Sequence, residues 1–141
     1  MKKISLFIFI LLLAHISKLT AQYKYACFEN DVNKKLQLTV YFKSDKAVLL
    51  KYKGQKRSTR LIYSTTEQTG NETGSPAFFW KETYLAKNGR RVTGTYTFTN
   101  GGAYELQLSY IDKKTNKKNA FIIIESLAGE NFSPYRNAPC F

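Results

Sequence analysis

The side chains with catalytic potential in this sequence are one histidine, two cysteines and ten carboxylates. The histidine, His15, lies in an apolar N-terminal segment, so the rest of the chain has no imidazole for a Ser-His-Asp or Cys-His arrangement or for a histidine-ligated zinc. Two carboxylates would suffice for glycoside hydrolysis. The nearest pair, Glu29 and Asp31, sits beside Cys27, where solvated side chains are the simpler interpretation. We therefore predict that the protein is not an enzyme and uses no metal or other cofactor.

The N-terminal segment has the parts of a secretory signal peptide. Lys2 and Lys3 precede an apolar run over residues 4–14, and the small residue Ala21 stands at a suitable cleavage position before Gln22. A retained membrane anchor is the alternative, but the run is shorter than the roughly 20 residues that a bilayer-spanning helix needs. We expect cleavage after residue 21 and export of residues 22–141 to the periplasm or the extracellular space. The short, lysine-led signal is typical of a bacterial protein.

The two cysteines, Cys27 and Cys140, stand near the two ends of the expected mature chain. In an oxidising compartment an isolated pair most simply forms one disulfide. Closing a loop of about 110 residues would stabilise the fold by about 4–5 kcal/mol, because it restricts the unfolded chain. The alternatives are two free thiols or a nucleophilic thiol, and the second lacks a histidine to activate it.

Seven segments are predicted to be β-strands, and most of them alternate apolar and polar residues with the period of two that is typical of half-buried strands. They are residues 36–42, 46–53, 58–65, 76–85, 92–99, 103–111 and 120–126. The last segment is apolar almost throughout, as is typical of a strand covered on both faces. Between the fifth and sixth segments, Asn100-Gly101-Gly102 predicts a tight hairpin turn, because glycine readily adopts a positive φ.

Seven or eight short strands in succession predict an all-β protein. We expect one domain over residues 22–141, folded as an antiparallel β-barrel or sandwich. No stretch of ten or more residues combines helical periodicity with a capping signal. Most connections are short, which favours an up-and-down barrel over a Greek key.

The longest polar connection, residues 65–79, leads into the most aromatic segment of the chain. Binding residues gather on loops that a rigid scaffold carries. The candidate partner-binding residues are therefore Gly74, Ser75, Phe78 and Trp80. An ordinary surface loop without a partner is the alternative.

Basic residues are in excess and fall into three clusters. Removal of Lys2, Lys3 and Lys18 with the signal lowers the formal net charge from +12 to +9. The clusters are Lys51, Lys53, Lys56, Arg57 and Arg60; Lys87, Arg90 and Arg91; and Lys113, Lys114, Lys117 and Lys118. Such surfaces attract anionic lipid, acidic polysaccharide or nucleic acid. Export makes nucleic acid an unexpected partner, so we predict that the third cluster contacts an anionic lipid or polysaccharide surface. A solvated surface without a ligand is the alternative.

The chain has Tyr25-Ala26-Cys27 near its mature start, two strand-like segments after it, Phe79-Trp80 in an aromatic segment and a closing Cys140. These features resemble the MliC/PliC-type inhibitors of C-type lysozyme, which are small exported antiparallel β-barrels. The resemblance implies an inhibitor whose loop contacts a muramidase-like protein. In that family the loop has Ser-Gly followed by a basic residue and tyrosine, whereas this chain has Gly74-Ser75-Pro76.

The net charge of +9 bears on which partner to expect. C-type lysozymes are basic, so a basic inhibitor would meet them with repulsion, and an acidic or neutral target is expected instead. Two other functions remain open. One is a lipocalin-like carrier of a small apolar ligand, although small barrels often fill their own interior with side chains. The other is a basic envelope or adhesion module.

Overall fold

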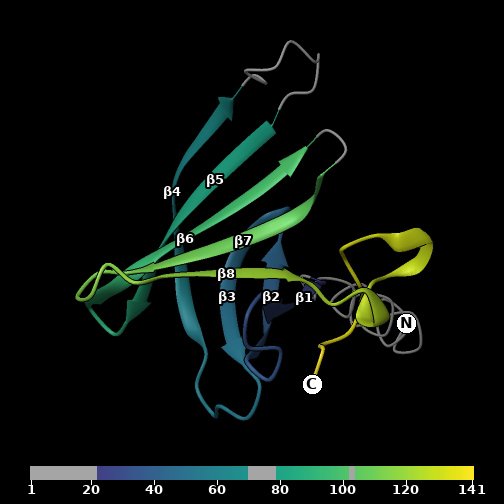
Figure 1. The fold of residues 1–141 in the computed structure, drawn as a ribbon, viewed down its shortest axis with the longest axis horizontal. Helices are drawn as coiled ribbons and strands as arrows, with labels where there is room; N and C mark the ends of the chain where they lie inside the picture. The colour runs from purple at the N-terminus through teal and green to yellow at the C-terminus, as the bar shows by residue number, and fades with distance from the viewer. Residues whose placement is uncertain (1–21, 70–78, 102–103) are drawn as a thin grey trace, which may run out of the picture.

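The computed structural model describes residues 22–69, 79–101 and 104–141, so the predicted signal peptide lies outside the described residues. Eight antiparallel strands close into one barrel (Figure 1). They are β1 (Lys24–Asn30), β2 (Gln37–Lys43), β3 (Lys46–Tyr52), β4 (Thr59–Thr69), β5 (Phe79–Asn88), β6 (Arg91–Gly101), β7 (Tyr104–Asp112) and β8 (Lys118–Ile123). Each strand pairs with its sequence neighbours, and β8 pairs with β1. The prediction of an all-β fold is confirmed. Of the two expected architectures, barrel and sandwich, the structure is a barrel, and its strands follow one another in up-and-down order.

β1 is the strand that the alternating pattern did not reveal. Ala26, Cys27 and Phe28 are consecutive and all buried. Ala26 and Phe28 belong to the interior core, whereas Cys27 points to the outer face, because successive side chains of a strand alternate. The C-terminal tail, residues 124–141, covers Cys27 there: the amide of Ile124 donates to its carbonyl at 2.9 Å. Because β1 is buried on both faces, its residues do not alternate between apolar and polar types.

The barrel interior is filled by apolar side chains from all eight strands. Phe98 makes edge-to-face contacts with Phe28, Phe42 and Tyr84, with ring centroids 5.4 to 6.3 Å apart. Such contacts stabilise aromatic pairs beyond the area that they bury. Side chains from β1, β2, β5 and β6 therefore meet across the interior.

Two details of the predicted strands are wrong. In β8, Phe121 and Ile123 are buried but Ile122 between them is only partly buried, so this strand is covered on one face more than on the other. Residues 65–69 and Phe79, which were expected in a loop, belong to strands β4 and β5. A register shift between Tyr63 and Thr65 interrupts the period of two in β4, and the Tyr63 ring is 45% exposed.

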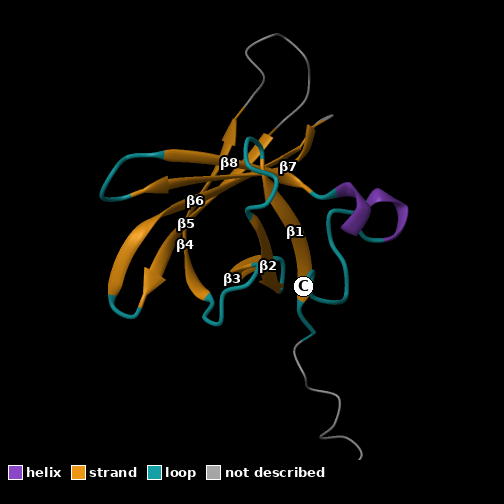
Figure 2. Cartoon of the chain, turned by 60° about the horizontal axis from the view of Figure 1, so that its bottom comes forward, coloured by secondary structure: helices purple, strands orange, loops and turns teal. Residues whose placement is uncertain are grey.

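The C-terminal tail folds back beside β1. It contains two short 3-10 helices, η1 (Glu125–Leu127) and η2 (Glu130–Phe132), which lie outside the barrel (Figure 2). Arg136 and Tyr25 exchange two backbone hydrogen bonds of 2.9 Å. Cys27 and Cys140 form the predicted disulfide, with their Cα atoms 5.8 Å apart. None of the helices in the described part of the chain has the length and apolarity to cross a bilayer.

Candidate functional site

The two ends of the barrel carry different charges. Adjacent strands are antiparallel, so the β1–β2, β3–β4, β5–β6 and β7–β8 connections lie at one end, termed here the basic end. These connections, residues 31–36, 53–58, 89–90 and 113–117, hold one acidic residue, Asp31, and nine basic residues. The basic residues are Lys34, Lys35, Lys53, Lys56, Arg57, Arg90, Lys113, Lys114 and Lys117. The turn at residues 44–45 and the start of the tail lie at the opposite, mouth end. Together, that turn and the tail hold Asp45, Glu125 and Glu130 against Arg136.

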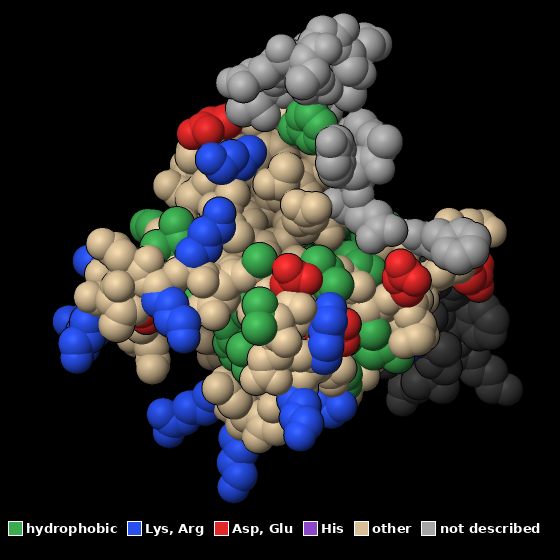
Figure 3. Space-filling model, viewed as in Figure 1, with side chains coloured by type: hydrophobic (Ala, Val, Ile, Leu, Met, Phe, Trp, Pro, Cys, Tyr) green, Lys and Arg blue, Asp and Glu red, His purple; other side chains and the backbone are tan. Residues whose placement is uncertain are grey.

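The three basic clusters of the sequence are therefore neighbours in space. In the space-filling view, Lys and Arg side chains gather along the left and lower sides, over the β3–β4, β5–β6 and β7–β8 turns (Figures 1 and 3). Acidic side chains lie mainly in the upper, central and right parts of the same face, where single Lys and Arg side chains also occur (Figure 3). Like charges concentrated on one surface produce a potential that extends into solvent. The barrel thus has an electrostatic polarity along its axis.

The basic end contains a hollow of about 490 Å³ between the β5–β6 and β7–β8 turns. Its lining consists of Arg91, Lys113 and Lys114 together with Asn88, Val92, Thr93 and the acidic Asp112. The hollow joins the second and third clusters into one surface. Of the four predicted lysines, the first three stand in the β7–β8 turn and the fourth begins β8, and all four are exposed.

Asp112 holds the β7–β8 turn in shape. Its Oδ1 accepts hydrogen bonds from the amides of Lys114 and Thr115, at 2.9 and 2.8 Å, and from the Thr115 hydroxyl at 3.0 Å. The hydrogen bonds from Thr115 hold the pKa of the Asp112 carboxyl below its usual range, and the amide of Lys114 adds to the effect. The Asp112 carboxylate therefore binds the backbone of its own turn and stabilises the conformation in which the turn lysines are exposed.

At the mouth end, a second hollow of about 240 Å³ opens beside Trp80; we term it the mouth pocket. Trp80, near the start of β5, is 50% exposed, which is unusual for so large an apolar ring. Phe42, Phe98 and Leu106 form the buried floor. The remaining lining residues are Asp45, Glu82, Asn100 and Tyr135.

Glu82 is held in place inside this pocket by its neighbours. Its Oε2 accepts a 2.6 Å hydrogen bond from the hydroxyl of Tyr84, and its Oε1 pairs with the ammonium of Lys46. Burial raises the pKa of the Tyr84 phenol, and the hydrogen bond to Glu82 raises it further. The Glu82 side chain is 25% exposed, so the carboxylate is fixed yet reachable from solvent.

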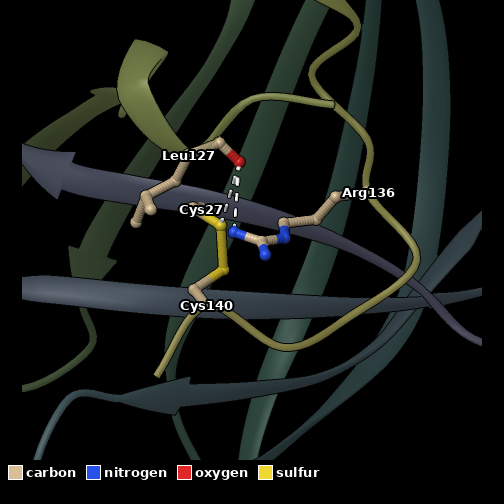
Figure 4. The surroundings of a disulfide bond; sticks show 4 residues. All are labelled: Cys27, Leu127, Arg136 and Cys140. Atoms are coloured by element: carbon tan, nitrogen blue, oxygen red, sulfur yellow. Dashed lines mark hydrogen bonds between the residues drawn. A yellow bond between two sulfur atoms is a disulfide. The ribbon is translucent and has the colours of Figure 1, made fainter. Parts of the chain in front are cut away.

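The C-terminal tail supplies one wall of the mouth pocket through Tyr135. Its ring packs edge-to-face on Phe42 at 5.2 Å, and its pKa is raised by burial and then by the charges of Asp45 and Glu82. Next to it, Arg136 is tied to β1 through its backbone, and its guanidinium donates to the Leu127 carbonyl at 3.4 Å (Figure 4). The disulfide anchors the end of the same segment (Figure 4). It therefore helps to position this wall.

The structure places the predicted site residues as follows. Trp80 lines the mouth pocket, whereas Gly74, Ser75 and Phe78 lie outside the described residues. Asp45, Glu82 and Tyr135 were missed, because no local pattern connects a turn, a strand and the tail. The sequence analysis also did not predict that the three basic clusters lie at the same end of the barrel. The order of the strands along the chain could have predicted this, because alternate connections of an up-and-down barrel share one end. All three clusters stand at connections that follow odd-numbered strands.

Neither metal-ligating groups among the described residues nor comparisons with known proteins identify a ligand for this site. Within the described residues, no group of three or more His, Cys, Asp or Glu side chains is arranged to hold a metal ion. Both cysteines are in the disulfide, so neither is available as a nucleophilic thiol or metal ligand. Comparisons of the chain with protein-family models, curated proteins and solved structures found no match.

Proposed function

We propose that this protein is an exported, non-enzymatic binding module whose basic end attaches to an anionic surface that bears phosphate or carboxylate groups. The observation that carries the proposal is the convergence of three basic clusters, distant in sequence, on one end of a rigid barrel. Nine basic residues in four neighbouring connections provide many weak contacts at once. Their combined attraction is strong at low salt and weakens as salt screens the charges over about 10 Å at 0.1 M.

The filled interior favours a surface-binding role over a carrier. Phe98 contacts rings from three other strands, and buried apolar side chains from all eight strands occupy the interior, where an enclosed apolar ligand would have to lie. A carrier would need these rings to move apart, and tightly packed side chains resist such displacement.

A second candidate is a protein-binding role at the mouth end, as the resemblance to lysozyme inhibitors implies. The observation that favours it is the segregation of charge. A basic muramidase that approaches Trp80 would meet Asp45 and Glu82, whose charges Lys24 and Lys46 offset in part, and the nine basic residues of the basic end lie at the opposite end of the barrel. The net charge of +9 therefore does not forbid such a partner. Inhibition assays on several muramidase classes test this candidate, and a Trp80→Ala variant should weaken any inhibition found.

The main proposal is tested with two variants of equal charge. One changes Lys113, Lys114 and Lys117 to Gln at the basic end. The other changes the exposed Lys24, Lys43 and Lys81 to Gln near the mouth end. Each lysine near an anionic membrane contributes about 1 kcal/mol. The first variant should thus lose about a hundredfold in affinity for vesicles containing phosphatidylglycerol, and the second should lose far less.

Beads of an acidic polysaccharide such as alginate provide the other arm of this experiment. Stronger retention on alginate assigns carboxylate groups, and stronger binding to the vesicles assigns phosphate. Equal losses in the two variants would mean that net charge alone drives binding, and the proposal would be abandoned. Binding that survives high salt undiminished would contradict it as well.

A further inference from the structure

The mouth pocket combines aromatic rings with hydrogen-bond acceptors. Among the described residues, the rings of Phe42, Trp80, Phe98 and Tyr135 line it. Two carboxylates, Asp45 and Glu82, stand among them, and none of the described lining residues is a lysine or an arginine. Aromatic rings attract cations through their quadrupoles, and cages of such rings recognise ammonium groups. The lining therefore suits a positively charged organic group.

The size of the pocket limits the ligand. Its volume of about 240 Å³ lies below the roughly 300–1,000 Å³ of sites for drug-sized ligands. One head group or one side-chain end fits this space. The floor, which includes Phe42 and Phe98, is buried and packed. A ligand would contact the floor with its apolar part and leave the rest of its body in solvent.

Both carboxylates have a lysine partner outside the pocket. Lys24 lies 3.5 Å from Asp45, and Lys46 pairs with Glu82. The Asp45 side chain is 89% exposed, so its pair with Lys24 is screened by water. A carboxylate has about four acceptor sites and can bind a second cation. We expect the two lysines to weaken the binding of a cation without preventing it.

We infer that the mouth pocket is a binding site for a single organic ammonium group, held between Trp80 and the carboxylates of Asp45 and Glu82. This inference is independent of the proposed function, because it concerns the opposite end of the barrel. The ammonium can belong to a quaternary head group such as choline or to a lysine-like primary amine. The two share the charge and the apolar flank that the pocket recognises.

Trp80 provides a direct readout, because it is the single tryptophan of the chain. Its fluorescence is titrated with choline chloride and with N-acetyl-lysine amide, each at constant ionic strength. The controls are 3,3-dimethylbutanol, a neutral analogue of choline, and N-acetylglucosamine, a neutral sugar. Saturable changes in emission at millimolar ammonium, with weaker responses to both neutral compounds, are expected. A larger response to choline assigns a quaternary head group, and a larger response to the lysine derivative assigns a primary amine.

Three variants test the role of charge. Asp45 has a φ of 62°, which asparagine tolerates well, so Asp45→Asn should fold normally and bind ammonium more weakly. Lys46→Met removes the ammonium group that pairs with Glu82. Because the Lys46–Glu82 pair is partly exposed, the variant should bind ammonium ligands more tightly by up to about fivefold. Lys113→Met removes the same charge at the far end and should leave the affinity unchanged. Opposite effects of the first two variants are the signature of a cation site.

Several results would overturn the inference. A response to dimethylbutanol equal to that of choline would identify an apolar pocket without charge recognition. Saturation by N-acetylglucosamine without a response to either ammonium would identify a sugar site. Absence of any saturable response, with Trp80 still accessible to a neutral quencher, would show that the pocket binds none of these groups.

Discussion

Replacement of both Cys27 and Cys140 by alanine should lower the stability of the barrel substantially. The bond joins residues 113 apart in the sequence. Closing a loop of this length restricts the unfolded chain by about 5 kcal/mol at 25 °C. That is a large share of the 5–15 kcal/mol by which domains are stable. About 120 residues give an unfolding entropy of about 0.25 kcal/mol/K, so the Tm should fall by about 20 °C.

Thermal unfolding followed by circular dichroism measures this change. The double alanine variant is compared with the oxidised and the chemically reduced protein. We expect the variant and the reduced protein to unfold at similar temperatures, because the cross-link and not the sulfur atoms carries the effect. A fall in Tm of less than about 5 °C would refute the loop-closure reasoning. It would mean that the backbone pairing of Arg136 with Tyr25 and the packing of Tyr135 hold the tail without the disulfide.

Two further predictions concern the interior. A Cβ added at Gly94 would lie 2.4 Å from the Tyr110 ring and 2.5 Å from the Ile111 carbonyl oxygen, so Gly94→Ala should destabilise the barrel by about 1–3 kcal/mol. At Gly89 an added Cβ would have open space, although φ is +59°, so Gly89→Ala should lower the free energy of unfolding by only about 1 kcal/mol. Denaturant titration of the two variants compares their stabilities. Burial raises the pKa of the phenols of Tyr52, Tyr84 and Tyr96, so the folded state keeps its phenolic protons above pH 10, where the unfolded state loses them. Stability should therefore be present below about pH 10 and fall above it, by up to about 1.4 kcal/mol per pH unit for each phenol. Tyr96→Phe should make the decline in Tm with pH shallower, and an unchanged decline would contradict this assignment.

The fold was largely predictable from alternation along the chain. The residues that alternate, such as Leu106 and Leu108 in β7, are buried as expected. Prediction failed in two places. Cys27 is covered by the tail on its outer face, and β4 has a register shift after Tyr63, so the period of two is lost at both positions. Both effects depend on contacts distant in sequence, which a local pattern does not contain.

The candidate site was predictable only in part. Trp80 was predicted as a binding residue because it is aromatic and follows a polar connection, and in the structure it lines a pocket. Asp45 and Tyr135 could not be assigned to the same pocket, because one belongs to a hairpin turn and the other to the tail. Their meeting depends on barrel closure and on the disulfide that holds the tail. The basic end, by contrast, follows from counting strands, since alternate connections of an up-and-down barrel share one end.

Collisional quenching of Trp80 fluorescence tests directly whether the basic end of the barrel faces the anionic surface. Trp80 lies at the end opposite to the basic clusters and is half exposed. If the basic end docks on vesicles containing phosphatidylglycerol, acrylamide should quench Trp80 equally well in the free and the bound protein. Shielding of Trp80 on binding would show that the mouth end faces the surface, and this would contradict the account.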